Sequence, residues 1–297
     1  AQSKQGVQEF LNEINTISKV RHPNLVELIG CCVKGTNRIL VYEYLENSSI
    51  DRVILGESSR GLKSTLMKLD WNNRSAICLG IAKGLAFLHE EVSPHIVHRD
   101  IKASNILLDK DLNPKIGDFG LAKLFPDDIT HISTRIAGTT GYLAPEYALG
   151  GQLTSKADVY SFGVVLLEII SGRSTGKRIW QGMENVVLQW AWTLYEEGKV
   201  LEVVDPELGE FPEDVVIRHI KVAFFCTQAA ASRRPVMSQV VDMLSKDMKL
   251  NDDMLTAPGL FFLDSASNNG ATRKHSSHSS SQQTSTVPDS ITELAPR

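Results

Sequence analysis

The stretch IVHRDIKASNILLD, residues 96–109, places a polar loop between two brief apolar runs. The apolar runs have the length and character of short buried strands, so the polar loop is held at both ends. Within the loop an acid, a cation and an amide follow one another as Asp100, Lys102 and Asn105. A rigid loop with these three groups can contact one small polar substrate from several sides. The stretch therefore predicts a substrate-binding loop on a packed scaffold.

The composition of the 297-residue chain is that of a globular protein, with 42% hydrophobic and 22% charged residues. A net charge of −4 argues against a nucleic-acid or anionic-membrane binder. No apolar run approaches the roughly 18 residues that cross a membrane, so no transmembrane segment is expected. The cysteines lack metal-ligand spacing, which favours reduced, buried thiols in a cytosolic protein: Cys31, Cys32, Cys78 and Cys226.

Hydrophobic periodicity predicts a chain that is mostly helical after about residue 45. One helix over 7–19 and two strands within 25–45, joined by a turn at KGTN, are expected first. The later helices are expected from the N-cap Asp70 to about His89, over 157–172, and near 184–197, 212–228 and 236–246. After about residue 250 the sequence is rich in Ser, Thr, Asn and Gln, which predicts a disordered tail.

Three motifs occur in a fixed order along the middle of the chain. HRDIKASN at 98–105 is followed by DFG at 118–120 and APE at 144–146, and then by an apolar helix that contains Asp158. Taken alone, Asp100 reads as a turn residue and Asp118 as a turn or helix cap, but the ordered set argues against chance. The set resembles a eukaryotic protein kinase catalytic domain over about residues 7–246.

The resemblance implies an α+β, bilobal protein-kinase-like fold with a mostly α-helical C-lobe. Residues 1–45 would form an incomplete N-lobe with helix C and two strands, 46–250 the C-lobe, and 251–297 a disordered Ser-rich tail. A complete kinase also has a Gly-rich loop and a strand that carries the Lys of a V-A-I-K motif. This sequence has neither, so the chain is expected to be N-terminally truncated, without the first three strands. Glu13 matches the helix Glu that pairs with that absent Lys.

Phosphoryl transfer relies mainly on positioning and charge neutralisation, and the resemblance assigns these tasks to particular residues. Asp100 would orient the attacking hydroxyl and accept its proton, and Lys102 would lie against the γ-phosphate of ATP. Asn105 and Asp118 would hold Mg²⁺ (or Mn²⁺) ions through oxygen ligands. Thr139 would contact the catalytic Asp and Lys, and a Lys two residues after the Asp is typical of serine/threonine kinases.

The resemblance also assigns the binding of adenine. Tyr42 would be the gatekeeper, Glu43 and Leu45 would give backbone hydrogen bonds to adenine, and Leu107 would form the floor beneath the ring. ATP and the Ser/Thr residues of protein substrates are therefore the expected partners, with no nucleic acid.

The resemblance also assigns regulatory and structural roles to particular residues. Arg99 marks the subclass that responds to phosphorylation of the activation loop, because a buried Arg needs an anionic partner. Thr130, Ser133 and Thr134 are the candidates, with Thr134 preferred. Residues with expected structural roles are the packing residues His98 and Phe119, the buried helix residue Asp158, and the ion pair of Glu146 with Arg234.

The sequence around the motifs indicates which group of protein kinases the chain resembles. NLVELIGCC and AGTTGYLAPEYALGGQLTSKADVYSFGVVLLEIISGR resemble plant receptor-like and receptor-like cytoplasmic serine/threonine kinases, of the cold-responsive protein kinase type. An upstream receptor kinase is then an expected partner. The expected location is cytoplasmic, or at the cytoplasmic face of the plasma membrane through a missing N-terminal part.

Two functions remain open from the sequence. The first is a protein serine/threonine kinase in receptor-linked signalling, which the intact set Asp100, Lys102, Asn105 and Asp118 favours. The alternative is a catalytically impaired kinase-like fragment that acts as a binding or scaffold module, because the Lys expected opposite Glu13 is absent from the sequence.

Overall fold

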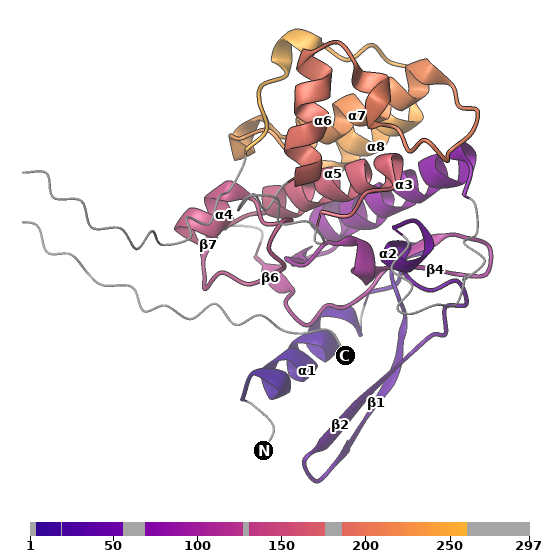
Figure 1. Cartoon of the computed structure of the whole chain (residues 1–297). Helices are drawn as coiled ribbons and strands as arrows, with labels where there is room; N and C mark the ends of the chain where they lie inside the picture. Colours follow the sequence, from indigo (N-terminus) through magenta and orange to yellow (C-terminus); the bar gives the residue numbers. More distant parts are fainter. Residues whose placement is uncertain (1–3, 19, 56–68, 127–130, 176–185, 260–297) are drawn as a thin grey trace, which may run out of the picture. The chain divides into compact units, whose positions relative to one another are not determined.

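The computed structural model describes most of the unit formed by residues 1–263, in the ranges 4–18, 20–55, 69–126, 131–175 and 186–259. None of the described helices is long and apolar enough to cross a membrane. The expected α+β organisation is confirmed, with a mostly helical lobe and a partial N-lobe (Figure 1).

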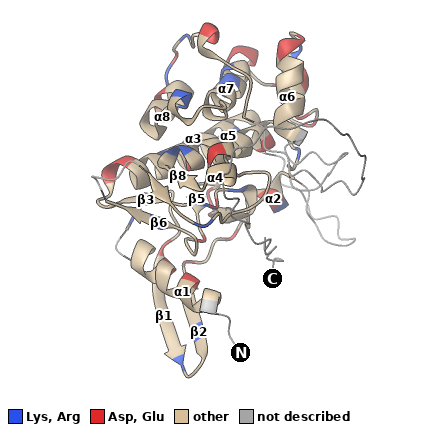
Figure 2. Ribbon diagram, turned by 90° about the vertical axis from the view of Figure 1, so that its left-hand side faces the viewer, with Lys and Arg blue, Asp and Glu red and all other residues tan. Residues whose placement is uncertain are grey.

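The partial N-lobe consists of helix α1 (Lys4–Ile17) and an antiparallel hairpin of β1 (Leu28–Lys34) and β2 (Asn37–Tyr42). The turn of the hairpin contains Gly35 at a φ of 61°, a left-handed conformation that glycine adopts without steric cost. The hairpin carries its charged side chains only toward the turn, whereas charges are spread over the helical lobe (Figure 2).

Seven α-helices of the described residues lie in the helical lobe. They are α2 (Ile50–Val53), α3 (Trp71–Ala86), α4 (Pro145–Gly150), α5 (Ser155–Ser171), α6 (Val186–Glu196), α7 (Glu213–Cys226) and α8 (Met237–Ser245). Short helical turns lie at Phe87–Glu91, Ala103–Asn105, Val200–Val203, Ala231–Arg233 and Asp252–Met254. The predicted helices near 157–172, 184–197, 212–228 and 236–246 are therefore confirmed within a few residues.

Helix α5 is the centre of this lobe and packs against α3, α6 and α7. Its side chains are buried almost all round, as its apolar sequence predicts. Gly163 allows the close approach to α7, because a Cβ there would lie 2.7 Å from the Thr227 methyl carbon and 2.9 Å from the Ala223 carbonyl oxygen. The helix begins at the N-cap Thr154, which accepts a hydrogen bond from the Lys156 N–H, and ends at Gly172.

Four short strands place the segments that carry the motifs. Strand β3 (His95–Val97) pairs with β6 (Lys123–Phe125), and β4 (Ile106–Leu108) pairs with β5 (Pro114–Ile116), both antiparallel. The loop 98–105 therefore connects β3 to β4, and the turn 117–122 connects β5 to β6. A further pair, β7 (Ile132–Ser133) and β8 (Gln152–Leu153), joins the segment before the APE motif to the residues after α4.

The segment between α1 and β1 is bonded to the helical lobe. Leu25 forms a parallel bridge to Ile116, and the Asn24 side-chain amide donates to the Pro114 carbonyl oxygen over 2.9 Å. Gly80 of α3 leaves the room for this contact, since a Cβ there would lie 2.5 Å from the Pro114 ring. The division at residue 45 stays a prediction, but these contacts tie 24–26 to the lobe that follows it.

The boundary predicted for the tail is too early. Gly259 accepts a hydrogen bond from the Tyr160 hydroxyl at 2.5 Å and donates one to the Thr227 carbonyl oxygen at 2.9 Å. The disorder predicted from residue 251 is therefore wrong for 251–259, where backbone hydrogen bonds secure the chain to α5 and to the end of α7. The remainder of the predicted tail, 260–297, lies outside the described residues.

Candidate active site

Asp158, near the start of α5, fixes the beginning of the catalytic loop, residues 98–105. Its carboxylate accepts hydrogen bonds from the backbone N–H groups of His98 (2.7 Å) and Arg99 (2.8 Å) and pairs with the His89 Nε2 at 2.9 Å. Burial alone would raise the pKa of Asp158, but His89, His98 and the Arg99 N–H hold it below its ordinary value. A buried anion thus anchors the loop to the central helix.

His98 and Phe119 pack between the catalytic loop and the turn 117–122. His98 is fully buried, and its ring meets the Phe119 ring edge-on with centroids 4.8 Å apart. The His98 Nδ1 accepts from the Asp100 N–H at 3.3 Å, so its Nε2 carries the proton and donates to the Gly117 carbonyl oxygen at 3.0 Å. The two rings therefore lie packed between the loop and the turn.

Asp100, Lys102, Asn105 and Thr139 form one closed cluster. The Thr139 hydroxyl donates to the Asp100 Oδ1 at 2.7 Å and accepts from the Lys102 Nζ at 2.9 Å. The Lys102 Nζ lies 2.8 Å from the Asp100 Oδ2, and the Asn105 Nδ2 donates to the Asp100 carbonyl oxygen at 2.9 Å. The acid, the cation and the amide of the loop therefore meet, and a threonine from a distant segment joins them.

Asp118 lies beside this cluster on the turn 117–122. The Gly117 N–H donates to the Asn105 carbonyl oxygen at 2.9 Å, which ties the turn to the catalytic loop. Asp118 is exposed and has a φ of 64°, and its Oδ1 accepts a long hydrogen bond of 3.4 Å from the Gly120 N–H. Its carboxylate is therefore accessible to a ligand.

The oxygens of Asn105 and Asp118 fit a hard divalent cation. Asn105 donates through its Nδ2 to Asp100, which leaves its Oδ1 as an acceptor for a cation. Within the described part of the chain, no three His, Cys, Asp or Glu side chains form a metal cluster. Mg²⁺ that is held with a nucleotide needs only one or two protein carboxylates or amides besides the phosphates and waters. The donor set therefore fits a nucleotide-bound Mg²⁺ better than an all-protein metal cage.

Glu13 of α1 is buried against the same turn. Its carboxylate accepts hydrogen bonds from the Tyr42 hydroxyl and, at 3.2 Å, from the Phe119 N–H. Burial raises the pKa of Glu13, although the Tyr42 hydrogen bond opposes the shift, and burial with the nearby Glu13 raises the pKa of Tyr42. No Lys or Arg among the described residues forms an ion pair with Glu13.

The residues expected to contact adenine follow β2 and lie on β4. The Glu43 N–H donates to the Glu27 carbonyl oxygen at 3.1 Å, and its carboxylate pairs with Lys115 at 2.8 Å. This leaves the carbonyl of Glu43, rather than its N–H, for a nucleotide. Leu45 and Leu107 are half-buried.

Arg99 contacts neutral acceptors. Its guanidinium donates to the Tyr147 hydroxyl at 2.5 Å and to the carbonyl oxygens of Leu121 (3.0 Å) and Arg135 (2.9 Å). The candidate phosphorylation sites Ser133 and Thr134 lie in and after β7, and the Thr134 N–H donates to the Gly151 carbonyl oxygen. No described contact joins Arg99 to either hydroxyl, and the third candidate, Thr130, lies outside the described residues.

Glu146 and Arg234 form the ion pair expected from the sequence. Both terminal nitrogens of the Arg234 guanidinium lie 2.8 Å from a Glu146 carboxylate oxygen, and the Arg234 side chain is fully buried. The pair links the start of α4 to the segment before α8.

Three residues with specific contacts at the site were missed by the sequence reasoning. Asn12 donates hydrogen bonds to the turn 117–122, His89 pairs with Asp158, and the Tyr147 hydroxyl accepts hydrogen bonds from Arg99. Their partners are distant in the sequence, so neither spacing nor motif indicates them. Asn12 precedes Glu13, and Tyr147 follows Glu146, so proximity to a motif residue was the only signal.

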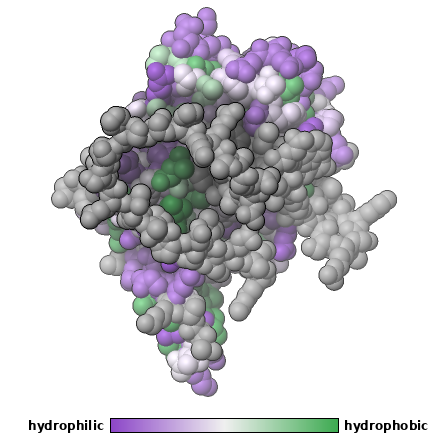
Figure 3. Space-filling view, turned by 60° about the vertical axis from the view of Figure 1, so that its left-hand side comes forward, coloured by the Kyte–Doolittle hydropathy of each residue, from purple (hydrophilic) through white to green (hydrophobic). Residues whose placement is uncertain are grey.

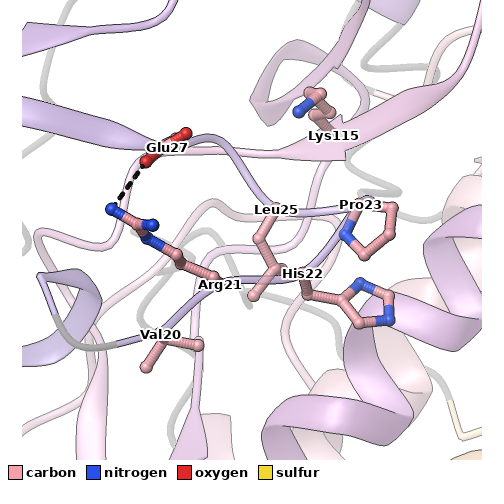
Figure 4. Close-up of a pocket in the computed structure, with 7 residues that line it drawn as sticks. All are labelled: Val20, Arg21, His22, Pro23, Leu25, Glu27 and Lys115. Atoms are coloured by element: carbon pink, nitrogen blue, oxygen red, sulfur yellow. Dashed lines mark ion pairs between the residues drawn. The ribbon is translucent and has the colours of Figure 1, made fainter.

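A pocket of about 330 Å³ lies outside the catalytic loop and the turn 117–122 (Figure 4). It is lined by Val20, Arg21, His22, Pro23, Leu25, Glu27 and Lys115, and Arg21 pairs with Glu27 across 3.2 Å at its edge. The lining contains no residue of the catalytic loop or of the turn 117–122. We therefore place the candidate active site at the cluster around Asp100 and not in this pocket.

The fold and the site define the class of the protein. The family model of protein tyrosine and serine/threonine kinases matches residues 1–244, and the chain belongs to this family. Protein kinases act on proteins and use ATP with a divalent metal ion.

Similar proteins are found in Arabidopsis thaliana. The chain is 49% identical over 306 residues to "Cold-responsive protein kinase 1", with 95% of this chain and 78% of that protein covered. It is 58% and 55% identical to two proteins named "Probable LRR receptor-like serine/threonine-protein kinase", with 82% of this chain covered in both cases. The chain spans only 24% and 25% of the length of these two receptor-like relatives.

Proposed function

We propose that the chain transfers the γ-phosphate of ATP to serine and threonine hydroxyls of proteins. The observation that carries the proposal is the closed cluster of Asp100, Lys102 and Thr139, in which a carboxylate, an ammonium group and a hydroxyl lie within 2.7–2.9 Å of one another. This cluster is bonded through Asn105 and Gly117 to the turn that carries Asp118.

The roles follow from the chemistry of the groups. The Asp100 carboxylate would accept the proton of the attacking hydroxyl, and the hydroxyl of Thr139 would orient that carboxylate. Lys102 would neutralise charge on the γ-phosphate, since its ammonium group already lies beside the carboxylate. Tyr42, Glu43, Leu45 and Leu107 would surround the adenine of ATP.

Asn105 and Asp118 would hold Mg²⁺ or Mn²⁺ through their side-chain oxygens. The ion, when bound, neutralises charge on the phosphates of the nucleotide. The chain contributes an Asp118 that is exposed at a fixed turn and an Asn105 whose amide is oriented by Asp100.

The preference for serine and threonine rests on Lys102 and on the names of the relatives. Receptor-linked signalling in plants, an upstream receptor kinase and a location at the cytoplasmic face of the plasma membrane belong to the same proposal. The support for them is that relatives of 58% and 55% identity are named LRR receptor-like serine/threonine-protein kinases.

A second function, a binding or scaffold module with impaired catalysis, is favoured by the contacts of Glu13. Its carboxylate pairs with a hydroxyl and a backbone N–H instead of a cation that would also contact the phosphates. A protein of this kind would bind partners through the same lobe without efficient turnover.

One assay separates the two functions. The purified 297-residue chain is incubated with γ-labelled ATP, Mg²⁺ and panels of Ser, Thr and Tyr peptides, with Asp100→Asn as the control. Label on Ser and Thr peptides that disappears in the control supports the kinase. Binding of nucleotide or of protein partners without any transfer of label, in the chain and in the control alike, supports the scaffold.

A further inference from the structure

The side chain of Asn12 reaches from α1 into the turn 117–122. Its Nδ2 lies 3.3 Å from the carbonyl oxygen of Phe119, 3.0 Å from that of Gly120 and 2.7 Å from that of Ala122. Three backbone carbonyls of one turn therefore converge on a single amide group. The amide has two protons, so it satisfies the two nearer carbonyls and lies at the limit of bonding to the third.

The residue next to Asn12 holds the other side of the same turn. The Glu13 carboxylate accepts the Phe119 N–H at 3.2 Å, and the Tyr42 hydroxyl in turn donates to Glu13. Two successive residues of α1 thus bond the turn in opposite senses, one as a donor to its carbonyls and the other as an acceptor from its N–H.

Asp118 depends on support of this kind. Its φ of 64° is uncommon for a residue other than glycine, and such a conformation persists only where the surroundings enforce it. The side chain of Asp118 supplies little support itself, because its hydrogen bond to the Gly120 N–H is 3.4 Å long. The hydrogen bonds that hold the backbone around Asp118 come from Asn12 and Glu13 on α1 and, on the side of the catalytic loop, from Asn105, His98 and Arg99.

We propose that Asn12 is a positioning residue that, with Glu13, clamps the turn 117–122 and so sets the position of the Asp118 carboxylate. The inference rests on the proposed function only in the step from Asp118 to the metal ion.

Two substitutions of Asn12 test the clamp, and they are expected to loosen the turn to different degrees. Ala removes both donors and leaves the carbonyls to water. Asp keeps the shape but places a carboxylate among three carbonyl oxygens and next to Glu13, so it is expected to loosen the turn more than Ala. Asn47 supplies the matched control, since its Nδ2 donates to the Asp109 carbonyl oxygen at 2.7 Å outside this turn.

The first measurement tests the clamp without any ligand. Amide hydrogen exchange of residues 118–123 is compared in the 297-residue chain and in Asn12→Ala, Asn12→Asp and Asn47→Ala, with far-ultraviolet circular dichroism to verify folding. We expect exchange about tenfold faster in Asn12→Ala, the loss of about one well-formed hydrogen bond, and faster still in Asn12→Asp. Unchanged exchange in both Asn12 variants would overturn the clamp.

The second measurement tests what the clamp does. Calorimetry gives the affinity for ATP with Mg²⁺ and with a chelator, and the ratio of the two affinities isolates the part that depends on the metal. We expect Asn12→Ala to lower this ratio about five- to tenfold and to leave the chelator value unchanged, whereas Asn47→Ala changes neither. An equal loss with and without Mg²⁺ would overturn the positioning role. A parent chain whose affinity does not depend on Mg²⁺ would count against the proposed function, while the exchange result would still decide the clamp.

Discussion

The clusters around Asp100 and around Glu13 both centre on a buried carboxylate, but different groups complete them. Asp100 is bonded to the Lys102 ammonium and the Thr139 hydroxyl. Among the described residues, Glu13 accepts hydrogen bonds from neutral donors, the Tyr42 hydroxyl and the Phe119 N–H. A described cation, Lys102, balances the first carboxylate, no described Lys or Arg pairs with the second, and burial raises the pKa of Glu13. The helical lobe therefore contains a complete charge arrangement, and the partial N-lobe does not.

The two regions also differ in how they bury apolar surface. Helix α5 hides nearly every side chain, whereas the hairpin exposes Ile29 by 66%, Val33 by 59% and Ile39 by 55%. Figure 3 shows apolar side chains on the lower part of the molecule, where the hairpin lies. Burial of apolar area is the main source of stability, so the helical lobe holds most of it. The following experiments test this contrast.

Asp100→Asn is expected to have the largest effect. The amide cannot accept a proton, so transfer of phosphate to Ser and Thr peptides should fall by about 10²–10⁴. ATP affinity, measured by calorimetry, should stay near that of the parent, because Asp100 addresses the hydroxyl and not the nucleotide. Asp109→Asn is the matched control, since Asp109 only caps a surface turn through the N–H groups of Asp111 and Asn113. Retention of near-full turnover in Asp100→Asn would contradict the assigned base.

The second largest effect is expected on the free energy of unfolding, to which the ion pairs of the two regions should contribute unequally. Glu146→Ala leaves the fully buried Arg234 guanidinium without its carboxylate, and we expect a loss of about 3–5 kcal/mol in the free energy of unfolding. Arg21→Ala breaks an exposed pair with Glu27 and should cost less than about 1 kcal/mol. Urea unfolding followed by circular dichroism measures both. Equal losses of unfolding free energy in the two variants would contradict the proposed difference between the two regions.

The parts of the site that are local in sequence were predictable. The loop from Asp100 to Asn105 is short and held between two strands, so its residue types predicted a loop whose polar groups can contact one small substrate, and the structure brings these groups together. The resemblance added Thr139 and the pair of Glu146 with Arg234, and the structure places Thr139 beside Lys102 and Glu146 beside Arg234. The apolar run of α5 predicted that this helix lies at the centre of the core, because a helix that is apolar on all sides must be buried on all sides.

The remaining features depend on contacts between distant segments. Asn12 bonds a turn that follows it by more than 100 residues, and nothing in the helix sequence reveals which face meets that turn. Composition predicted disorder from residue 251, but 251–259 contacts the helical lobe through the backbone of Gly259 and through Asp252 and Thr256. Arg99 was expected to need an anion, and the carbonyls and hydroxyl that surround it instead could not be read from its motif.

Phosphorylation of Thr134 remains a prediction, with a smaller expected effect. A phosphate there would offer Arg99 an anionic partner in place of its neutral acceptors, so Thr134→Ala should lower transfer about tenfold, the worth of one charge-assisted hydrogen bond. The double variant with Thr134→Ala and Arg99→Ala should transfer phosphate at nearly the same rate as either single variant. Ser133→Ala is the neighbouring control. Mass spectrometry that finds 130–140 unmodified in fully active protein would refute this regulation.

Glu13→Gln should have the smallest effect and the opposite sign. The pKa of Glu13 is raised in the folded state, first by burial, so the folded protein binds this proton more tightly than the unfolded one. The stability that Glu13 contributes is full below the unfolded pKa and is lost as the pH rises through the folded pKa. Gln keeps an acceptor for Tyr42 and Phe119 without the buried charge, so at about pH 8 the Tm should rise by about 2 °C.

The pH dependence distinguishes this explanation from a general gain in packing. At about pH 4 the Glu13 carboxyl is already protonated in the folded protein, so the advantage of Gln should vanish there. Asp158 provides the opposite case, because its pKa is lowered in the folded state despite burial, and its contribution is present above the unfolded pKa and lost in acid. Asp158→Asn should therefore lower the Tm at about pH 8 and do so less in acid. A fall in Tm for Glu13→Gln at neutral pH would mean that a cation balances Glu13 after all, and the contrast between the two carboxylates would no longer hold.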